Sequence, residues 1–140
     1  MATVTVTGTS DNQYETRIMN DRHAFVADET EPLGTEIGPN PYEFLLSALG
    51  ACMPITLFMY PARREWSLEC VHIELSLDRV LADDFEHYEE EPGLVDVSER
   101  KIRLEGPLDD ERQERLACIA TRCPGHETLS TPTVIMDESE

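Results

Sequence analysis

The side chains of this chain with the most distinctive chemistry are four cysteines, at positions 52, 70, 118 and 123. Cys123 opens the run Cys123-Pro124-Gly125-His126, and proline suits the first helical position, so this thiol should stand at a helix N-terminus. Backbone N–H groups and the helix dipole favour a thiolate there, and Arg122 and His126 are close in the sequence. The position of Cys123 therefore indicates a reactive thiol.

Cys52 stands in the apolar run ALGACMPITL, where a free cysteine is often only a small buried side chain. Position alone leaves both a structural and a chemical role open for it. Cys70 and Cys118 face no obvious chemistry, and we interpret them as core thiols.

The spacing Cys118-x4-Cys123-x2-His126 offers nitrogen and sulfur ligands for a metal ion. That spacing is not the standard zinc spacing, and a fourth local ligand is missing, so no metal site is predicted. The sequence also has no phosphate-binding loop, dinucleotide fingerprint, G-x-S-x-G or H-E-x-x-H motif, which leaves nucleotide-binding, hydrolase and metalloprotease functions without support.

The elements that must position these residues begin with three short strands. Residues 2–9 alternate β-branched side chains, and residues 14–19 and 23–28 read as two further strands joined by a turn at Asn20-Asp21. Residues 29–39 are a loop rich in proline and glycine.

The clearest helix signal starts at Asn40, a good N-cap, followed by Pro41 and by Glu43 in the position of a capping box. Apolar residues then lie nearly all round the helix, which predicts burial on most sides. Pro54 should kink this helix just past Cys52. Because 140 residues offer little to cover such a helix, a partner subunit is the economical explanation.

The second half of the chain predicts a strand over residues 71–77, an acidic loop at 83–92 and a long strand over 95–104 with a bulge. A helix over 109–122, a short helix over 124–129 and a final strand over 131–137 complete the order. The chain is thus predicted to be one α+β domain over 1–140, with N-terminal strands (1–39), a central helix (40–65) and a C-terminal strand and helix part (66–140).

Charge excludes several partners. Asp and Glu number 29 against 11 Lys and Arg, which gives a formal net charge of −18. A field of that sign repels nucleic acid and anionic lipid, so we expect neither nucleic acid nor a membrane as partner. The apolar run from residue 44 to 60 is expected to be too short for a span of ~20 residues. Without a signal segment at the start, we expect a cytoplasmic protein with reduced thiols, and the acidic, lysine-poor composition suits a salt-rich cytoplasm.

Two segments together resemble the OsmC/Ohr family of osmotically inducible and organic hydroperoxide resistance proteins. One is Gly38-Pro39-Asn40-Pro41-Tyr42-Glu43-Phe44-Leu45-Leu46-Ser47-Ala48-Leu49-Gly50-Ala51-Cys52, similar to the family helix N-P-x-E/D-L-L-x-A-x-G-x-C. The other is Cys123-Pro124-Gly125-His126-Glu127-Thr128-Leu129, similar to C-P-[VG]-x-x-x-L. The order of strands and helices also fits, so the resemblance covers nearly the whole chain.

The resemblance implies an intertwined homodimer in which antiparallel sheets enclose central cysteine-bearing helices, and a thiol peroxidase activity on organic hydroperoxides with a dithiol reductant and no cofactor. By the same resemblance Cys52 is the peroxidatic thiol, Cys123 resolves it as a Cys52–Cys123 disulfide, and Glu43 holds a catalytic arginine. Arg22 is the preferred candidate for that arginine, with Arg17 second. An apolar site in a strongly acidic protein disfavours a thiolate, so a local cation is required.

The alternative is a dimeric, non-enzymatic relative that senses redox state or binds a small ligand and keeps its cysteines as core residues. The two hypotheses differ in whether the Cys52 thiol reacts rapidly near neutral pH.

Overall fold

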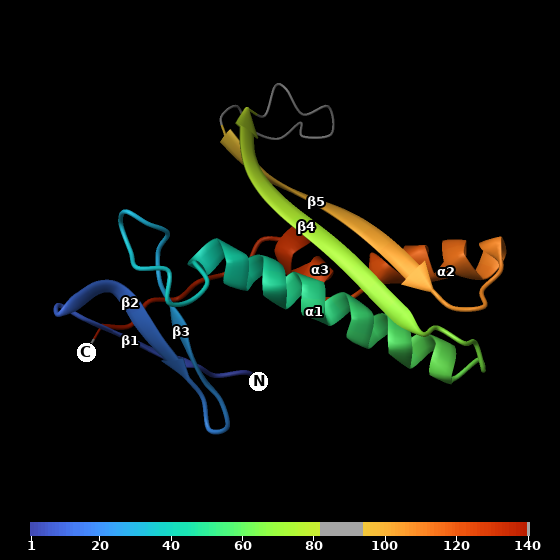
Figure 1. The fold of residues 1–140 in the computed structure, drawn as a ribbon, viewed down its shortest axis with the longest axis horizontal. Helices are drawn as coiled ribbons and strands as arrows, with labels where there is room; N and C mark the ends of the chain where they lie inside the picture. The colour runs from blue at the N-terminus through green and yellow to red at the C-terminus, as the bar shows by residue number, and fades with distance from the viewer. Residues whose placement is uncertain (82–93, 140) are drawn as a thin grey trace. The chain divides into compact units, whose positions relative to one another are not determined.

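The structure is a computed structural model that describes residues 1–81 and 94–139. The chain divides into two compact units, Met1–Leu45 and Leu46–Glu140. The predicted acidic loop at 83–92 lies outside the described residues. Figure 1 shows the order of strands and helices that is set out below.

The first unit is built on a three-stranded antiparallel sheet in the order β1-β2-β3. The three strands are β1 (Thr5–Thr9), β2 (Asn12–Met19) and β3 (Ala24–Ala27). The predicted turn between the second and third strands is present, and the Asn20 side-chain oxygen accepts the backbone N–H of Arg22 at 2.9 Å and of His23 at 2.8 Å. This asparagine supplies the turn chemistry that its position predicts.

The loop after β3 is organised by Asp28, which is only 2% exposed. Its carboxylate accepts the backbone N–H groups of Glu29, Thr35 and Ile37 and the Thr35 hydroxyl, at 2.8 to 3.3 Å. These hydrogen bonds, the one from Glu29 first, hold the pKa of Asp28 below its ordinary value. A buried carboxylate thus closes a loop that has no regular hydrogen bonding of its own.

The long helix α1 (Pro41–Ala62) begins with the capping box that the sequence predicts. The Asn40 side chain accepts the Glu43 N–H, and the Glu43 carboxylate accepts the Asn40 N–H, both at 2.9 Å. The helix continues through Pro54 and ends one residue after Pro61. Near the proline, the Thr56 hydroxyl donates to the Cys52 carbonyl at 3.0 Å.

By length and composition α1 could cross a membrane, since Pro41–Pro61 has a mean hydropathy of 1.6. The expectation that this run is too short to span was therefore wrong about its length. One such helix is weak evidence for a membrane protein, because core helices of soluble proteins meet the same criterion. In the single chain only 22% of the most apolar window of α1 is buried, and the residues that it does bury are described below.

The second unit contains the antiparallel pair β4 (Cys70–Leu81) and β5 (Leu94–Glu105), which runs alongside α1 in Figure 1. Their pairing runs unbroken from Cys70–Glu105 to Leu81–Leu94. The predicted bulge in the second of these strands is therefore wrong. Val97 and Ile102 are out of phase because they lie on opposite faces of a regular strand.

Two helices follow the hairpin, α2 (Asp110–Ala120) and α3 (Pro124–Ser130). The Asp109 side chain caps α2 by accepting the Arg112 N–H at 2.9 Å, and Cys123 is the N-cap of α3. The predicted strand over 131–137 is wrong: this segment has no regular secondary structure, and Val134, Ile135 and Met136 are 81 to 90% exposed. A strand requires a neighbour for its hydrogen bonds, and within the described residues this segment has no paired strand beside it.

The core of the second unit forms where α1 meets the hairpin and the two C-terminal helices. One buried cluster joins Leu57 of α1 to Leu116, Ile119 and Ala120 of α2. A second joins Leu49 and Met53 of α1 to Cys123. Leu49, Met53 and Leu57 are spaced by four residues, so α1 buries one stripe.

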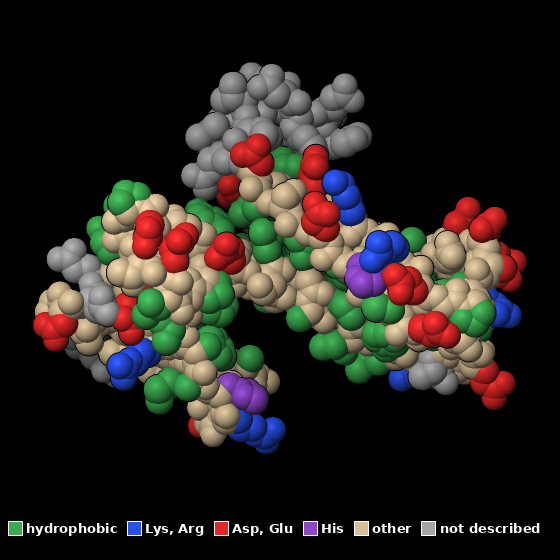
Figure 2. All heavy atoms as spheres, in the orientation of Figure 1, with side chains coloured by type: hydrophobic (Ala, Val, Ile, Leu, Met, Phe, Trp, Pro, Cys, Tyr) green, Lys and Arg blue, Asp and Glu red, His purple; other side chains and the backbone are tan. Residues whose placement is uncertain are grey.

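The rest of α1 is less covered than the sequence predicts. Ile55 is 59% exposed, Phe58 42% and Met59 62%, and their spacing places them on one face of the helix. The expected burial on most sides is thus wrong within the single chain. Figure 2 shows hydrophobic side chains at the surface along the course of α1, among many acidic ones.

Candidate active site

The structure brings Cys52 and Cys123 together although 71 positions separate them in the sequence. Cys52 lies in the middle of α1 and Cys123 caps α3. Both thiols are free. Cys123 is completely buried in the second core cluster, and Cys52 packs against that cluster from a half-buried position.

Each sulfur accepts a backbone N–H from the first turn of α3. Gly125 donates to Cys52 Sγ and His126 donates to Cys123 Sγ, both at 3.3 Å. The start of α3 therefore presents donors to both sulfur atoms. N–H donors of this kind stabilise negative charge on sulfur.

The expected thiolate at Cys123 is not supported by the structure. Burial raises the pKa of Cys123 above its ordinary value, and the hydrogen bond with Cys52 raises it further. The His126 N–H and the positive charge of Arg100 act in the opposite direction and are outweighed. The position of Cys123 at a helix N-terminus predicted the N–H donor that lowers its pKa, but it did not predict the burial that raises it.

Gly125 is required for this approach of α3 to α1. A Cβ atom at this position would lie 3.2 Å from Cys52 Cβ and 3.3 Å from Cys52 Sγ. These separations are tighter than ordinary van der Waals contact. The absence of a side chain at Gly125 thus lets its N–H reach the sulfur of Cys52.

The structure places a cation, Arg100, near the thiols. This residue was not predicted from the sequence. Its Nη1 donates to the Ala120 carbonyl at 3.2 Å and lies 3.5 Å from Met53 Sδ. Arg100 pairs with Leu75 across the hairpin, on the face of β5 that also carries Ile102. The alternation of β5 could have identified it as an inward-facing charge, but the expected bulge obscured the phase of the strand.

The other predicted site residues lie in the first unit. Glu43 has its carboxylate in the capping box of α1. Arg22 lies within the turn between β2 and β3, and Arg17 lies in β2 opposite Val26. The roles of Glu43 and of either arginine beside Cys52 stay predictions.

A pocket elsewhere in the second unit has a volume of about 710 Å³. It is lined by aromatic and charged side chains near the end of α1 and the start of α2, among them Tyr60, Trp66 and Arg115. The exposed Cys118 contributes to its wall. Neither Cys52 nor Cys123 lines it, so this cavity is separate from the thiol pair.

Comparison with known proteins places the chain in a family. The family model described as OsmC-like protein matches residues 34–137, which include both cysteine motifs. The chain therefore belongs to the OsmC-like family, as its two motifs predicted. A search of curated proteins gives no match.

Solved structures share the fold at low sequence identity. An osmotic stress induced and detoxification response protein from Psychrobacter arcticus is 20% identical, with a TM-score of 0.68 over 91% of this chain and 88% of that one. An OsmC-like protein from Mycoplasma pneumoniae is 19% identical, with a TM-score of 0.69 over 91% and 86%. An organic hydroperoxide resistance protein OsmC from Legionella pneumophila is 17% identical, with a TM-score of 0.64 over 92% and 90%. The predicted α+β, OsmC-like fold is thereby confirmed.

Proposed function

We propose that this protein is a thiol-dependent peroxidase that reduces organic hydroperoxides through Cys52 and Cys123. The observation that carries the proposal is that the start of α3 donates a backbone N–H to each sulfur, Gly125 to Cys52 Sγ and His126 to Cys123 Sγ, both at 3.3 Å. The Gly125 N–H that Cys52 Sγ accepts stabilises the negative charge that develops on this sulfur during attack. Membership in a family with a member named for organic hydroperoxide resistance supports the same chemistry.

The proposed reaction begins when the Cys52 thiolate attacks one oxygen of the hydroperoxide. The O–O bond breaks, the alkoxide leaves and takes a proton to become an alcohol, and Cys52 becomes a sulfenic acid. The Cys123 thiol condenses with this sulfenic acid, which forms an S–S bond and releases one water. A dithiol reductant supplies the two electrons that restore both thiols.

Arg100 is our preferred cation for this site. It is held in place through the Ala120 carbonyl and its charge acts on Cys123, and Met53, which it also contacts, follows Cys52 directly in α1. Arg22, which Glu43 would hold by the family resemblance, is the competing candidate. Substituting each arginine separately distinguishes them, as set out in the Discussion.

A homodimer is part of the proposal. The exposed face formed by Ile55, Phe58 and Met59 is an apolar surface on the same helix as Cys52, and a second copy would cover it. Sedimentation of the purified protein should give a dimer. A monomer that binds vesicles of neutral lipid would instead assign this face to a membrane and contradict the dimer.

The direct test follows consumption of cumene hydroperoxide with a dithiol reductant. The wild-type protein should turn over, and Cys52→Ser should abolish turnover. Cys118→Ser is the matched control, because Cys118 is also a free thiol but is exposed on α2. Equal turnover by Cys52→Ser and wild type would reject the enzyme and favour a protein with structural cysteines.

A further inference from the structure

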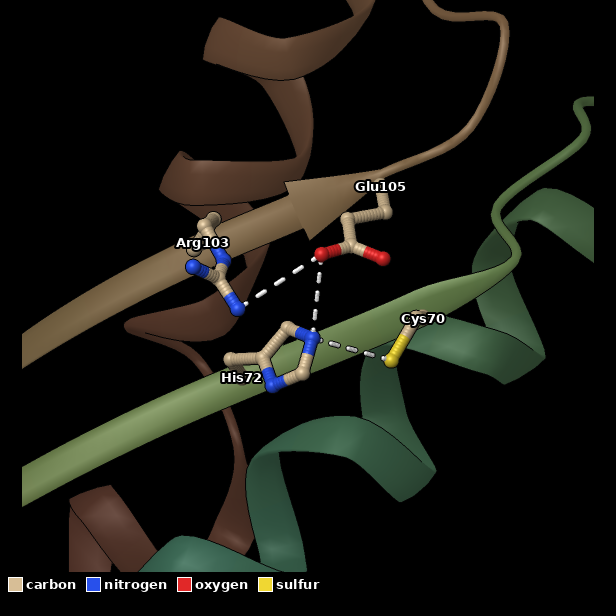
Figure 3. A network of polar contacts seen from close by, with 4 residues as sticks. All are labelled: Cys70, His72, Arg103 and Glu105. Atoms are coloured by element: carbon tan, nitrogen blue, oxygen red, sulfur yellow. Dashed lines mark hydrogen bonds and ion pairs between the residues drawn. The ribbon is translucent and has the colours of Figure 1, made fainter.

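A second group of reactive side chains lies on the β4–β5 hairpin, on the face that points away from α1. Cys70 and Glu105 are direct partners across the two strands, and His72 lies two residues further along β4 on the same face. The alternate residues Val71 and Ile73 contact the core clusters. Figure 3 shows the three side chains converging, with Arg103 beside them.

The convergence is close. His72 Nε2 lies 3.3 Å from Cys70 Sγ and 3.1 Å from Glu105 Oε1. The three ligand atoms all lie within 4.8 Å of one another. Among the described residues, Cys70, His72 and Glu105 are the cysteine, histidine and acidic side chains that lie close enough together to share a metal ion.

The geometry does not fit a relay in which a base takes a proton from the thiol. In such a relay one ring nitrogen faces the thiol and the other faces the carboxylate that orients the ring. Here the same nitrogen, Nε2, faces both Cys70 and Glu105 (Figure 3). The three possible metal-ligand atoms, Cys70 Sγ, His72 Nε2 and a Glu105 carboxylate oxygen, therefore gather around one place, which an ion could occupy.

Two of their separations are close to the edges of a metal coordination sphere, whereas Cys70 Sγ and the Glu105 carboxylate lie within 4.8 Å, so one of these side chains would rotate to close around an ion. A tetrahedral zinc ion with Zn–S of about 2.3 Å and Zn–N and Zn–O of about 2.0–2.1 Å has neighbouring ligand atoms about 3.3–3.6 Å apart. The two distances given above are within a few tenths of an ångström of those edges. We propose that Cys70, His72 and Glu105 form a zinc site that leaves one coordination position open to water.

The donor set selects the type of ion. Thiolate and imidazole ligands suit zinc, whereas calcium and magnesium prefer oxygen ligands alone. The His72 side chain is 47% exposed and that of Glu105 50%, so an ion can reach the site from solvent. The net charge of −18 raises the concentration of cations at the surface, which also favours binding.

Arg103 is the group that opposes binding. Its Nη2 lies 3.5 Å from Glu105 Oε1, the same oxygen that faces His72. A bound zinc ion would share this carboxylate with the guanidinium. Because Arg103 is a nearby positive charge, we expect Arg103→Gln to bind zinc at least as tightly as wild type.

The site would tie together the first residue of β4 and the last residue of β5. Zinc bound there should stabilise the folded protein, because the unfolded chain does not hold these three ligands in place. The site is separate from Cys52 and Cys123, which lie on the other face of the hairpin in the second core cluster.

The test measures zinc affinity of the full, reduced chain by competition with a chromophoric chelator. Wild type should bind one zinc ion at this site, and Cys70→Ser and His72→Gln should each weaken it at least about tenfold, since loss of even an outer partner of a ligand commonly costs 10- to 100-fold. The matched controls Cys118→Ser and His23→Gln should bind as wild type does. Unchanged affinity in both site variants would overturn the proposal.

A second measurement separates this site from zinc held by the other thiols. Zinc should slow alkylation of Cys70 by iodoacetamide, as read by mass spectrometry of each cysteine peptide. The exposed Cys118 should react at the same rate with and without zinc, and His72→Gln should remove the protection of Cys70. Protection confined to Cys52 and Cys123 would overturn the assignment.

Discussion

Cys123 is the N-cap of α3, and Gly125, two residues later, donates its backbone N–H to Cys52 Sγ at 3.3 Å. One short helix start therefore both supplies the second thiol and polarises the first. Cys123 is fully buried, which raises its pKa, whereas Cys52 is half-buried, so the two cysteines have different surroundings. This difference fits one attacking and one resolving thiol.

The raised pKa of Cys123 makes the stability of the protein depend on alkaline pH. In the unfolded chain this thiol loses its proton near pH ~8.5, whereas in the folded protein it keeps the proton to higher pH. The unfolded state then binds fewer protons, so the contribution of this group to stability is present below pH ~8.5 and is lost as the pH rises through the folded value.

Denaturant unfolding at several pH values checks this dependence. Wild type should lose more stability between pH 8 and 10 than Cys123→Ser does, while Cys118→Ser should behave as wild type. Parallel pH dependence in wild type and Cys123→Ser would contradict the assigned cause.

Replacement of Arg100 should slow the reaction. Arg100→Gln removes the positive charge beside the thiol pair and the hydrogen bond to the Ala120 carbonyl. The negative charge that develops during attack then loses a stabilising cation, so the peroxide consumption rate should fall about tenfold or more. Arg100→Lys should recover part of the rate because it keeps the charge. Arg22→Gln, made alongside, should have the smaller effect; the reverse ranking would assign the cation to Arg22.

Gly125→Ala should separate the two thiols. The added methyl group would lie 3.3 Å from Cys52 Sγ, so α3 or Cys52 must move by a few tenths of an ångström. We expect slower formation of the Cys52–Cys123 disulfide after a single dose of peroxide, measured by free-thiol titration. Gly8→Ala, where the nearest atom is 3.7 Å away, is the matched control and should leave the rate unchanged.

Two positions on α1 should separate folding from association. Leu57 is fully buried, so Leu57→Ala should lower the free energy of unfolding by about 2–5 kcal/mol. Ile55 is 59% exposed within the chain, so Ile55→Asp should leave a folded protein but shift it from dimer to monomer. Chemical denaturation and sedimentation measure the two effects, and a dimeric Ile55→Asp protein would exclude this face as the interface.

Features whose cause is local could be predicted from the sequence. The Asn40–Glu43 capping box, the Asn20 turn, Asp109 as the start of a helix and the short helix after Cys123 all depend on hydrogen bonds within three residues. The two cysteine motifs are local as well, and they identified the family. These predictions hold because the partners are fixed by spacing along the chain.

Features that depend on distant partners were decided by the tertiary structure. Residues 131–137 have the composition of a strand but no strand beside them, and Cys123 has the position of a reactive thiol but is buried. The group formed by Cys70, His72 and Glu105 becomes visible only when the register of β4 and β5 is known, and Arg100 faces inward only because β5 is a regular strand without a bulge. Composition and spacing determine which groups a segment offers, but desolvation and contact depend on what the folded chain places around them.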